Sequence, residues 1–194
     1  MGWILDLYRS PMAKKAVMAL TGLMLFGFVL THMLGNLKLY LGPDKLNEYA
    51  HGLREIGAPF FGHGEFLWVA RIGLLVAVGL HILSAWQLTQ INRRARPAGY
   101  ARESYEKSTY ASRTMRWGGV ILLLFVVYHL LHLTTGSVHS DFQPGDVYHN
   151  VVAGFSQPLV SAFYILANVA LGLHLFHGLW SLFQSLGLTG ARFN

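Results

Sequence analysis

The chain has 194 residues, of which 53% are hydrophobic and only 12% are charged, and its mean hydropathy is +0.39. This balance argues against a water-soluble globular domain and favours a single integral-membrane domain over residues 1–194. The formal charge of +6 raises the question of nucleic acid as a partner. Because the basic residues flank apolar segments, topology and lipid contact explain them better, and we expect no nucleic-acid partner.

The chain contains no cysteine. Disulfides, thiolate-bound iron–sulfur clusters and covalently attached c-type haem all require cysteine, so the sequence excludes them within this chain. It does contain ten histidines, and imidazole is a strong ligand for iron. The positions of the histidines relative to the apolar segments are therefore the main clue to function.

Four apolar segments are long enough to cross a bilayer, which takes about 20 residues in helical form. They run from about 15 to 40, 66 to 91, 117 to 136 and 158 to 186. Residues 44–57 carry apolar side chains at helical spacing among charged ones, as a helix lying on the membrane surface would, whereas residues 136–150 form a polar loop by composition. The sequence therefore predicts an all-α integral membrane protein, a bundle of four transmembrane helices.

Lysine and arginine are distributed unevenly beside these segments. One side takes eleven of them, namely Arg9, Lys14, Lys15, Arg93, Arg94, Arg96, Arg102, Lys107, Arg113, Arg116 and Arg192. The other side takes three, namely Lys38, Lys45 and Arg54. Cytoplasmic loops carry the excess of basic residues, so we expect the N-terminus to be cytoplasmic.

Every predicted span carries histidine, in the order His32, His81, His129 with His132, and His174 with His177. With a rise of about 1.5 Å per residue and alternating helix direction, His32 and His129 fall in the outer half of the membrane. His81 and His174 fall in the inner half. Two cross-helix pairs at different depths suit two stacked porphyrins, each with iron held by two imidazoles and suited to electron transfer. Spacing alone does not choose between the two histidines of segment three or of segment four, because each pair shares one helix face.

Other residues in the spans allow two interpretations. The glycines that interrupt the spans provide narrow helix surfaces, either for a porphyrin or for tight helix packing; they are Gly22, Gly27, Gly35, Gly73, Gly79, Gly118, Gly119, Gly172 and Gly178. Arg71 is costly in hydrocarbon unless it faces a partner such as a haem propionate, or extends to the interface. The remaining histidines, His51, His63, His139 and His149, lie in connections, and we expect them to be surface groups.

Four stretches carry a resemblance to a known family, namely TGLMLFGFVLTHMLGNL, GLHILSAWQLTQINRRARP, LFVVYHLLHLTTG and ALGLHLFHGLWSLFQSLGL. The chain resembles the cytochrome b subunit of succinate:quinone oxidoreductases (respiratory complex II) and fumarate reductases, in the branch where one polypeptide carries two haems. The resemblance selects His32 and His129 for the distal haem b, and His81 and His174 for the proximal one. His132 and His177 then become neighbours that contact propionates or order the ligand helices. That family usually has a fifth helix, whereas this sequence ends at LTGARFN, so the helix is absent or the sequence is truncated.

The resemblance also implies a function and partners. Two non-covalent, bis-histidine haems b would relay electrons between an iron–sulfur subunit and membrane quinone, menaquinone or ubiquinone, while a flavoprotein subunit interconverts succinate and fumarate of the tricarboxylic acid cycle. The chain itself would be a non-catalytic anchor in the cytoplasmic membrane of a prokaryote, within a complex that can form a higher oligomer. Ser10, Lys14 and Arg113 are candidates for docking or for the edge of the quinone site, with a solvated basic rim as the alternative.

Two other functions stay open at this point. The chain could anchor another respiratory enzyme through two haems b, such as a hydrogenase or a formate dehydrogenase. It could instead be a haem-free transporter or assembly protein whose histidines bind metal or carry protons. Copurifying subunits and a haem spectrum would distinguish these functions.

Overall fold

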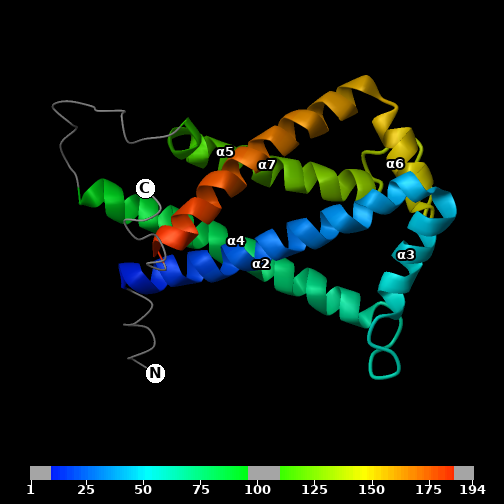
Figure 1. The fold of residues 1–194 in the computed structure, drawn as a ribbon, viewed down its shortest axis with the longest axis horizontal. Coiled ribbons are helices and arrows are strands. Elements are labelled where there is room, and N and C mark those ends of the chain that lie inside the picture. Colours follow the sequence, from blue (N-terminus) through cyan, green and yellow to red (C-terminus); the bar gives the residue numbers. More distant parts are fainter. Residues whose placement is uncertain (1–9, 96–109, 186–194) are drawn as a thin grey trace. The chain divides into compact units, whose positions relative to one another are not determined.

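The computed structural model describes residues 10–95 and 110–185, and this part of the chain is helical without any strand. Its helices are α2 (Pro11–Asn36), η1 (Leu37–Leu41), α3 (Pro43–Glu55), α4 (Glu65–Arg94), α5 (Tyr110–His129), η2 (Leu130–Thr134), α6 (Val147–Phe155) and α7 (Pro158–Ser185) (Figure 1). In the described part, four helical segments are long and apolar enough to cross a membrane. They correspond to α2 with η1, to α4, to α5 with η2, and to α7. The predicted fold class, an all-α membrane protein with four spans, is confirmed.

The starts of the helices follow local capping chemistry. The Ser10 hydroxyl accepts a hydrogen bond from the Ala13 N–H at 3.1 Å, and Pro11 begins α2. Pro158 begins α7, where the missing N–H of proline costs nothing. We expected the first span to start near residue 15, after the lysines. It starts earlier because backbone hydrogen bonding continues through Lys14 and Lys15, whatever their polarity.

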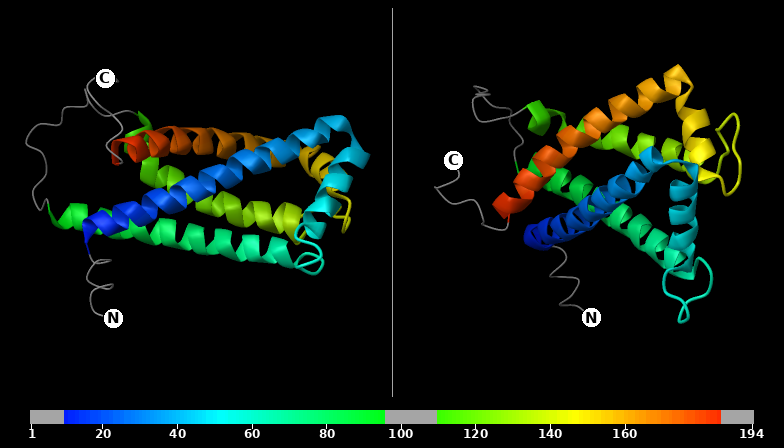
Figure 2. Two further views of the ribbon diagram at one scale, coloured as in Figure 1. Left: turned by 60° about the horizontal axis from the view of Figure 1, so that its bottom comes forward. Right: turned by 45° about the vertical axis from the view of Figure 1, so that its right-hand side comes forward.

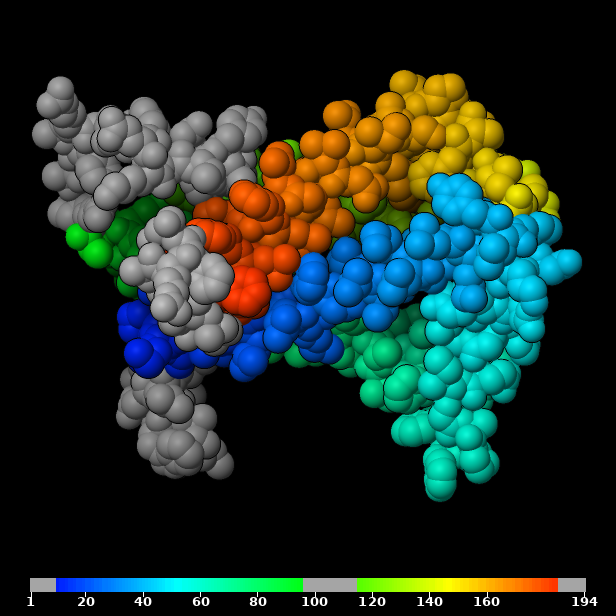
Figure 3. Space-filling model, in the orientation of Figure 1, coloured from blue at the N-terminus to red at the C-terminus, as the bar shows by residue number. Residues whose placement is uncertain are grey.

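The spans expose large apolar side chains along their length, as in α2 and α7 (blue and orange in Figure 3). Leu20, Leu75, Leu124 and Leu166 are each between 62% and 69% exposed. Soluble proteins rarely leave contiguous apolar surfaces of this kind uncovered, whereas lipid covers them at no cost. The chain is an integral membrane protein.

The chain divides into two compact units, each described by itself. The first unit holds the described residues 10–31, 67–95 and 180–185, and within it His81 on α4 lies 3.2 Å from the Met18 carbonyl oxygen on α2. A side of α4 with helical spacing, formed by Ala77, Ser84 and Leu88, is buried, with exposed fractions of 8% or less. The small residues Gly22 on α2 and Gly73 on α4 let the two helices approach.

The second unit holds residues 32–66 and the described residues 110–179. Within it α3 and α6 pack against each other, as the views of Figure 2 also show. Asn47 on α3 joins them, because its amide donates to Asp146 Oδ1 at 2.9 Å and its carbonyl oxygen accepts from the Tyr148 N–H at 3.0 Å. These contacts hold two short helices together at one end of the spans of this unit.

The connections were predicted less well than the spans. The surface helix expected over residues 44–57 is present as α3. The prediction of a loop over residues 136–150 is wrong at its C-terminal end, because α6 begins at Val147. Asp146 caps this helix by accepting a hydrogen bond from the His149 N–H at 2.9 Å. Because Asp146 lies in a run of glycine and polar residues, composition alone favoured a loop.

Candidate functional site

His32 on α2 and His129, the last residue of α5, lie against each other within the second unit. Their ring centroids are 5.9 Å apart and their planes are 86° apart. Two imidazoles that share one metal ion have centroids about 6 Å apart, because each metal–nitrogen bond is about 2 Å long. The pair therefore has the separation that ligation of one iron by two histidines requires.

His81 on α4 is oriented by α2 within the first unit. Its Nδ1 lies 3.2 Å from the Met18 carbonyl oxygen and 3.3 Å from the Thr21 hydroxyl. A carbonyl oxygen can only accept, so Nδ1 carries the ring proton and the lone pair of the neutral ring is on Nε2. Gly22 gives the ring its room, since a Cβ there would lie 3.2 Å from His81 Cε1. Histidines that bind a metal are commonly fixed in this tautomer by such a contact.

His174 and His177 lie one turn apart on α7, and both are half-buried. Gly119 on α5 lies beside His174, because a Cβ at residue 119 would be 4.0 Å from the His174 Cε1. His81 and His174 belong to different units of the chain. Their pairing, and the roles of His132 and His177, stay predictions.

Tyr164 on α7 contacts two histidines through its hydroxyl. The oxygen lies 3.3 Å from His129 Nδ1 and 3.1 Å from His132 Nδ1. The Tyr164 ring is only 6% exposed and packs edge-on against Phe125 and Phe155, with centroids 5.1 and 4.7 Å away. This aromatic shell holds the hydroxyl in place beside the ring of His129.

His132 lies on η2, a π-helical turn that continues α5, and its ring is 2% exposed. Its ring stacks with those of Tyr128 and His139, with centroids 5.4 and 4.7 Å away. His139 has a defined tautomer, because its Nδ1 accepts from the Asp141 N–H while its Nε2 lies 2.8 Å from the Asn150 carbonyl oxygen. The proton of the neutral His139 ring is therefore on Nε2.

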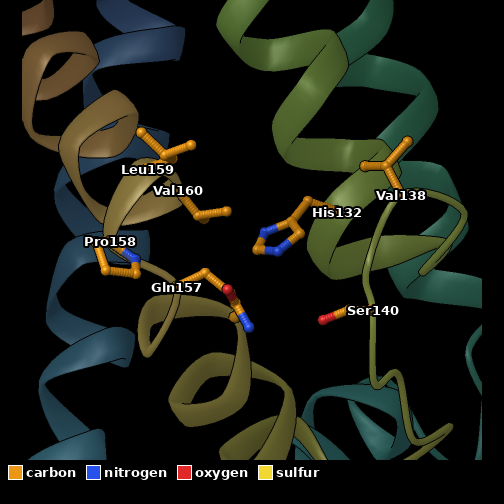
Figure 4. A pocket seen from close by; sticks show the side chains of 8 residues that line it. His132, Val138, Ser140, Gln157, Pro158, Leu159 and Val160 are labelled. Carbon is orange, nitrogen blue, oxygen red and sulfur yellow. The ribbon is translucent and has the colours of Figure 1, made fainter.

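A cavity of about 440 Å³ lies beside His132, and Figure 4 shows its lining. The polar side chains on its wall are His132, Ser140 and Gln157, and the apolar ones include Val138 and Val160. Ligand pockets commonly combine a mainly apolar lining with a few polar groups, and have volumes of about 300–1,000 Å³. The cavity is therefore large enough for a small ring-shaped ligand.

The other predicted residues have varied surroundings. Arg71 lies over the Trp68 ring, with its guanidinium carbon 4.9 Å from the ring centroid, as in a cation–π pair. The Ser10 hydroxyl is the cap of α2, and the Lys14 side chain is 8% exposed. The side chain of Arg113 lies outside the described residues. The contact of Arg71 with a propionate, and the docking role of the other three, stay predictions.

The histidines in the connections make local contacts. His63 pairs with Glu55 at 2.6 Å, and His149 pairs with Asp141 at 2.9 Å. In the part of the chain that the structure describes, no three or more histidine and acidic side chains gather in a way that could hold a bare metal ion. A haem iron takes only two axial ligands from the protein, and the His32–His129 pair provides two imidazoles, so these residues fit that group.

Residues 92–192 match the model of a family described as the succinate dehydrogenase/fumarate reductase transmembrane subunit. The match spans more than half of the chain. The chain belongs to this family. No curated protein and no solved structure matches it.

This transmembrane subunit is thus a membrane subunit of a succinate dehydrogenase or fumarate reductase complex, in association with the other subunits of that complex. The matched region includes the histidines of α5, η2 and α7, whereas His32 and His81 precede it. Sequence reasoning missed Tyr164, although a signal was present. A tyrosine within an apolar span needs a hydrogen-bond partner for its hydroxyl, because lipid offers none.

Proposed function

We propose that this transmembrane subunit is the di-haem b anchor of a succinate:quinone oxidoreductase, which passes electrons between the iron–sulfur subunit of the complex and membrane quinone. The observation that carries the proposal is the contact between His32 and His129, at a separation suited to one iron, in a chain of this family. Family membership favours this function over an anchor for a hydrogenase or a formate dehydrogenase, and over a haem-free transporter.

Haem b, when bound, supplies reversible one-electron chemistry at its iron. His32 and His129 would hold one haem iron, and His81 and His174 would hold the other. Two imidazoles leave no open position for oxygen, which suits electron transfer. The Met18 carbonyl beside His81 supports the second site, because it fixes the ring in the tautomer whose Nε2 can bind a metal.

The cavity beside His132 is the proposed place of the quinone ring. Ser140 and Gln157 offer hydrogen-bonding groups that the two carbonyl oxygens of a quinone could use, and Val138 and Val160 offer apolar contact. The cavity and the His32–His129 pair belong to the same unit of the chain. His132, on the wall of the cavity, is linked to His129 through the Tyr164 hydroxyl.

The test is purification from native membranes with haem counted per chain. We expect two haems b for each chain, with a flavoprotein and an iron–sulfur protein in the same preparation. His32→Leu and His129→Leu should each remove the same haem, as judged by its spectrum, and leave one per chain. His81→Leu and His174→Leu should each remove the other. The matched control is His51→Leu, because His51 is exposed in a connection and should leave both haems in place.

Two results would reject the proposal. A colourless preparation from intact membranes would exclude the di-haem function. Loss of different haems in the His32 and His129 variants would break the pairing on which the proposal depends.

A further inference from the structure

The contacts of Tyr164 restrict where protons can lie in the second unit. Its hydroxyl lies within hydrogen-bond distance of Nδ1 on both His129 and His132. A phenol has one proton to donate, so it cannot donate to two ring nitrogens at once. At least one of the two Nδ1 atoms must carry a proton and donate to Tyr164 for both hydrogen bonds to form.

The surroundings of the two histidines differ, and the difference indicates which one donates. His129 lies against His32. The Nε2 side of the His132 ring faces the backbone of α6 at Gly154. A Cβ added to Gly154 would lie only 3.0 Å from His132 Nε2 and 2.7 Å from His132 Cε1. The edge of His132 that could bind iron is thus closed by α6, which leaves His129 as the ligand of this helix.

We propose that Tyr164 is a positioning residue for the iron ligand His129, an inference that rests on the proposed di-haem function. With iron on Nε2, the proton of His129 is on Nδ1 and is donated to the Tyr164 oxygen. The Tyr164 hydroxyl then donates to His132 Nδ1, and the proton of His132 is on Nε2. The buried hydroxyl of Tyr164 thus fixes the orientation of the His129 ring and the tautomers of His129 and His132.

The π-helical turn makes this arrangement possible. The Thr135 N–H bonds to the Leu130 carbonyl oxygen at 2.9 Å, five residues back, so the helix widens directly after His129. Such single wide turns occur often at functional sites. Here the turn carries His132, whose ring stacks with those of Tyr128 and His139 and whose Nδ1 lies 3.1 Å from the Tyr164 hydroxyl.

The expected effect concerns one haem only. An acceptor on Nδ1 makes an imidazole a stronger electron donor to its metal, and so favours the oxidised iron. Loss of the Tyr164 hydroxyl should therefore raise the midpoint potential of the haem held by His129 and leave the potential of the other haem unchanged.

The experiment is a redox titration of the purified complex with Tyr164→Phe, which keeps the ring and its aromatic contacts. The distal haem is identified as the one that is lost in His129→Leu. We expect its reduction equilibrium to shift by up to tenfold, about 59 mV for one electron, with two haems still present per chain. The matched control is Tyr128→Phe, because Tyr128 lies in the same aromatic shell and meets His132 through its ring.

The outcomes separate this inference from the proposed function. A wild-type complex without haem rejects both. Two haems in the wild type, with no shift in Tyr164→Phe or with equal shifts in both haems, overturns the role of Tyr164 and leaves the di-haem function standing. If Tyr164→Phe does not assemble, His132→Phe takes its place. This variant removes the acceptor of the Tyr164 proton. A rise in the midpoint potential of the distal haem alone, smaller than that expected for Tyr164→Phe, supports the inference. An unchanged midpoint potential of the distal haem overturns it.

Discussion

Single polar residues in the spans satisfy their hydrogen bonds close by. The hydroxyl groups of Thr21, Thr31 and Thr89 each donate to the carbonyl oxygen four residues earlier, at 2.7, 3.0 and 2.8 Å. In hydrocarbon an unsatisfied polar group costs several kcal/mol, so short side chains bond back to their own helix. Tyr164 is different because its longer side chain carries the hydroxyl to two histidines, His129 on α5 and His132 on η2. Contacts such as those of Tyr164 fix how the helices of the second unit pack against each other.

A single methyl group added at Gly154 should destabilise the packing around His132. A Cβ at residue 154 would lie 2.7 Å from His132 Cε1, closer than non-bonded atoms can approach, and 3.1 Å from His139 Nε2, which is a tight contact. Both rings are fixed, His132 by stacking and His139 by hydrogen bonds, so neither can move aside cheaply. Overpacking of this kind costs about 1–3 kcal/mol. We expect Gly154→Ala to lower the midpoint of thermal unfolding in detergent.

The matched control for this substitution is Gly172→Ala on α7. A Cβ at residue 172 would meet nothing within 4 Å among the described residues. An unchanged or higher midpoint is expected, because alanine is the better helix former. If the two variants unfold alike, the packing of His132 against α6 is not what the structure indicates.

At the scale of elements, the short helices α3 and α6 are joined by polar contacts near Asp146. This carboxylate accepts from the His149 N–H and from the Asn47 amide, both at 2.9 Å. The backbone hydrogen bond from His149, with that from Asn47 next, holds the pKa of Asp146 below its ordinary value of 3.8. One charged side chain therefore both begins α6 and ties it to α3.

The stabilisation by Asp146 should depend on pH in one direction. A carboxyl whose pKa is lowered by folding stabilises the folded state above its ordinary pKa of 3.8, and the stabilisation is lost as the pH falls through the folded value. We expect Asp146→Asn to lower the unfolding midpoint at pH 7, with a difference from wild type that shrinks below pH 3.8. The measurement is thermal unfolding of both proteins from pH 7 to pH 3.

Glu48→Gln is the control for this series. Glu48 forms only an exposed pair with Lys45 at 3.1 Å, and such surface pairs contribute little to stability. If the unfolding midpoint of Asp146→Asn differs from that of wild type by the same amount at every pH, the charge of Asp146 is not what stabilises α6.

The elements differ in how far the sequence predicts them. Length and apolar composition were enough for the four spans, since only a helix satisfies its own backbone in lipid. The regular rise of a helix placed His32 and His129 at one level, and the structure brings these two rings together. The π-turn at Leu130–Thr134, α6 and the contacts of Tyr164 were not predicted. They depend on helix rotation and on partners distant in sequence, which periodicity does not encode.

At the scale of the whole molecule, charge distribution predicts how the chain crosses the membrane. The side with eleven basic residues should be cytoplasmic, and the side with three, which includes α3, should face outward. The absence of cysteine makes this directly testable, because a single introduced thiol is the only reactive one in the chain. Glu48 on α3 and Arg94 at the end of α4 are both exposed and lie on opposite predicted sides.

We expect Glu48→Cys to react with a membrane-impermeant maleimide in intact cells, and Arg94→Cys to react only after the membrane is opened. The unmodified chain, which has no thiol, gives the background of the experiment. Reaction of Arg94→Cys alone in intact cells would invert the topology. The side with eleven basic residues would then face outward, against the expectation from the charge distribution.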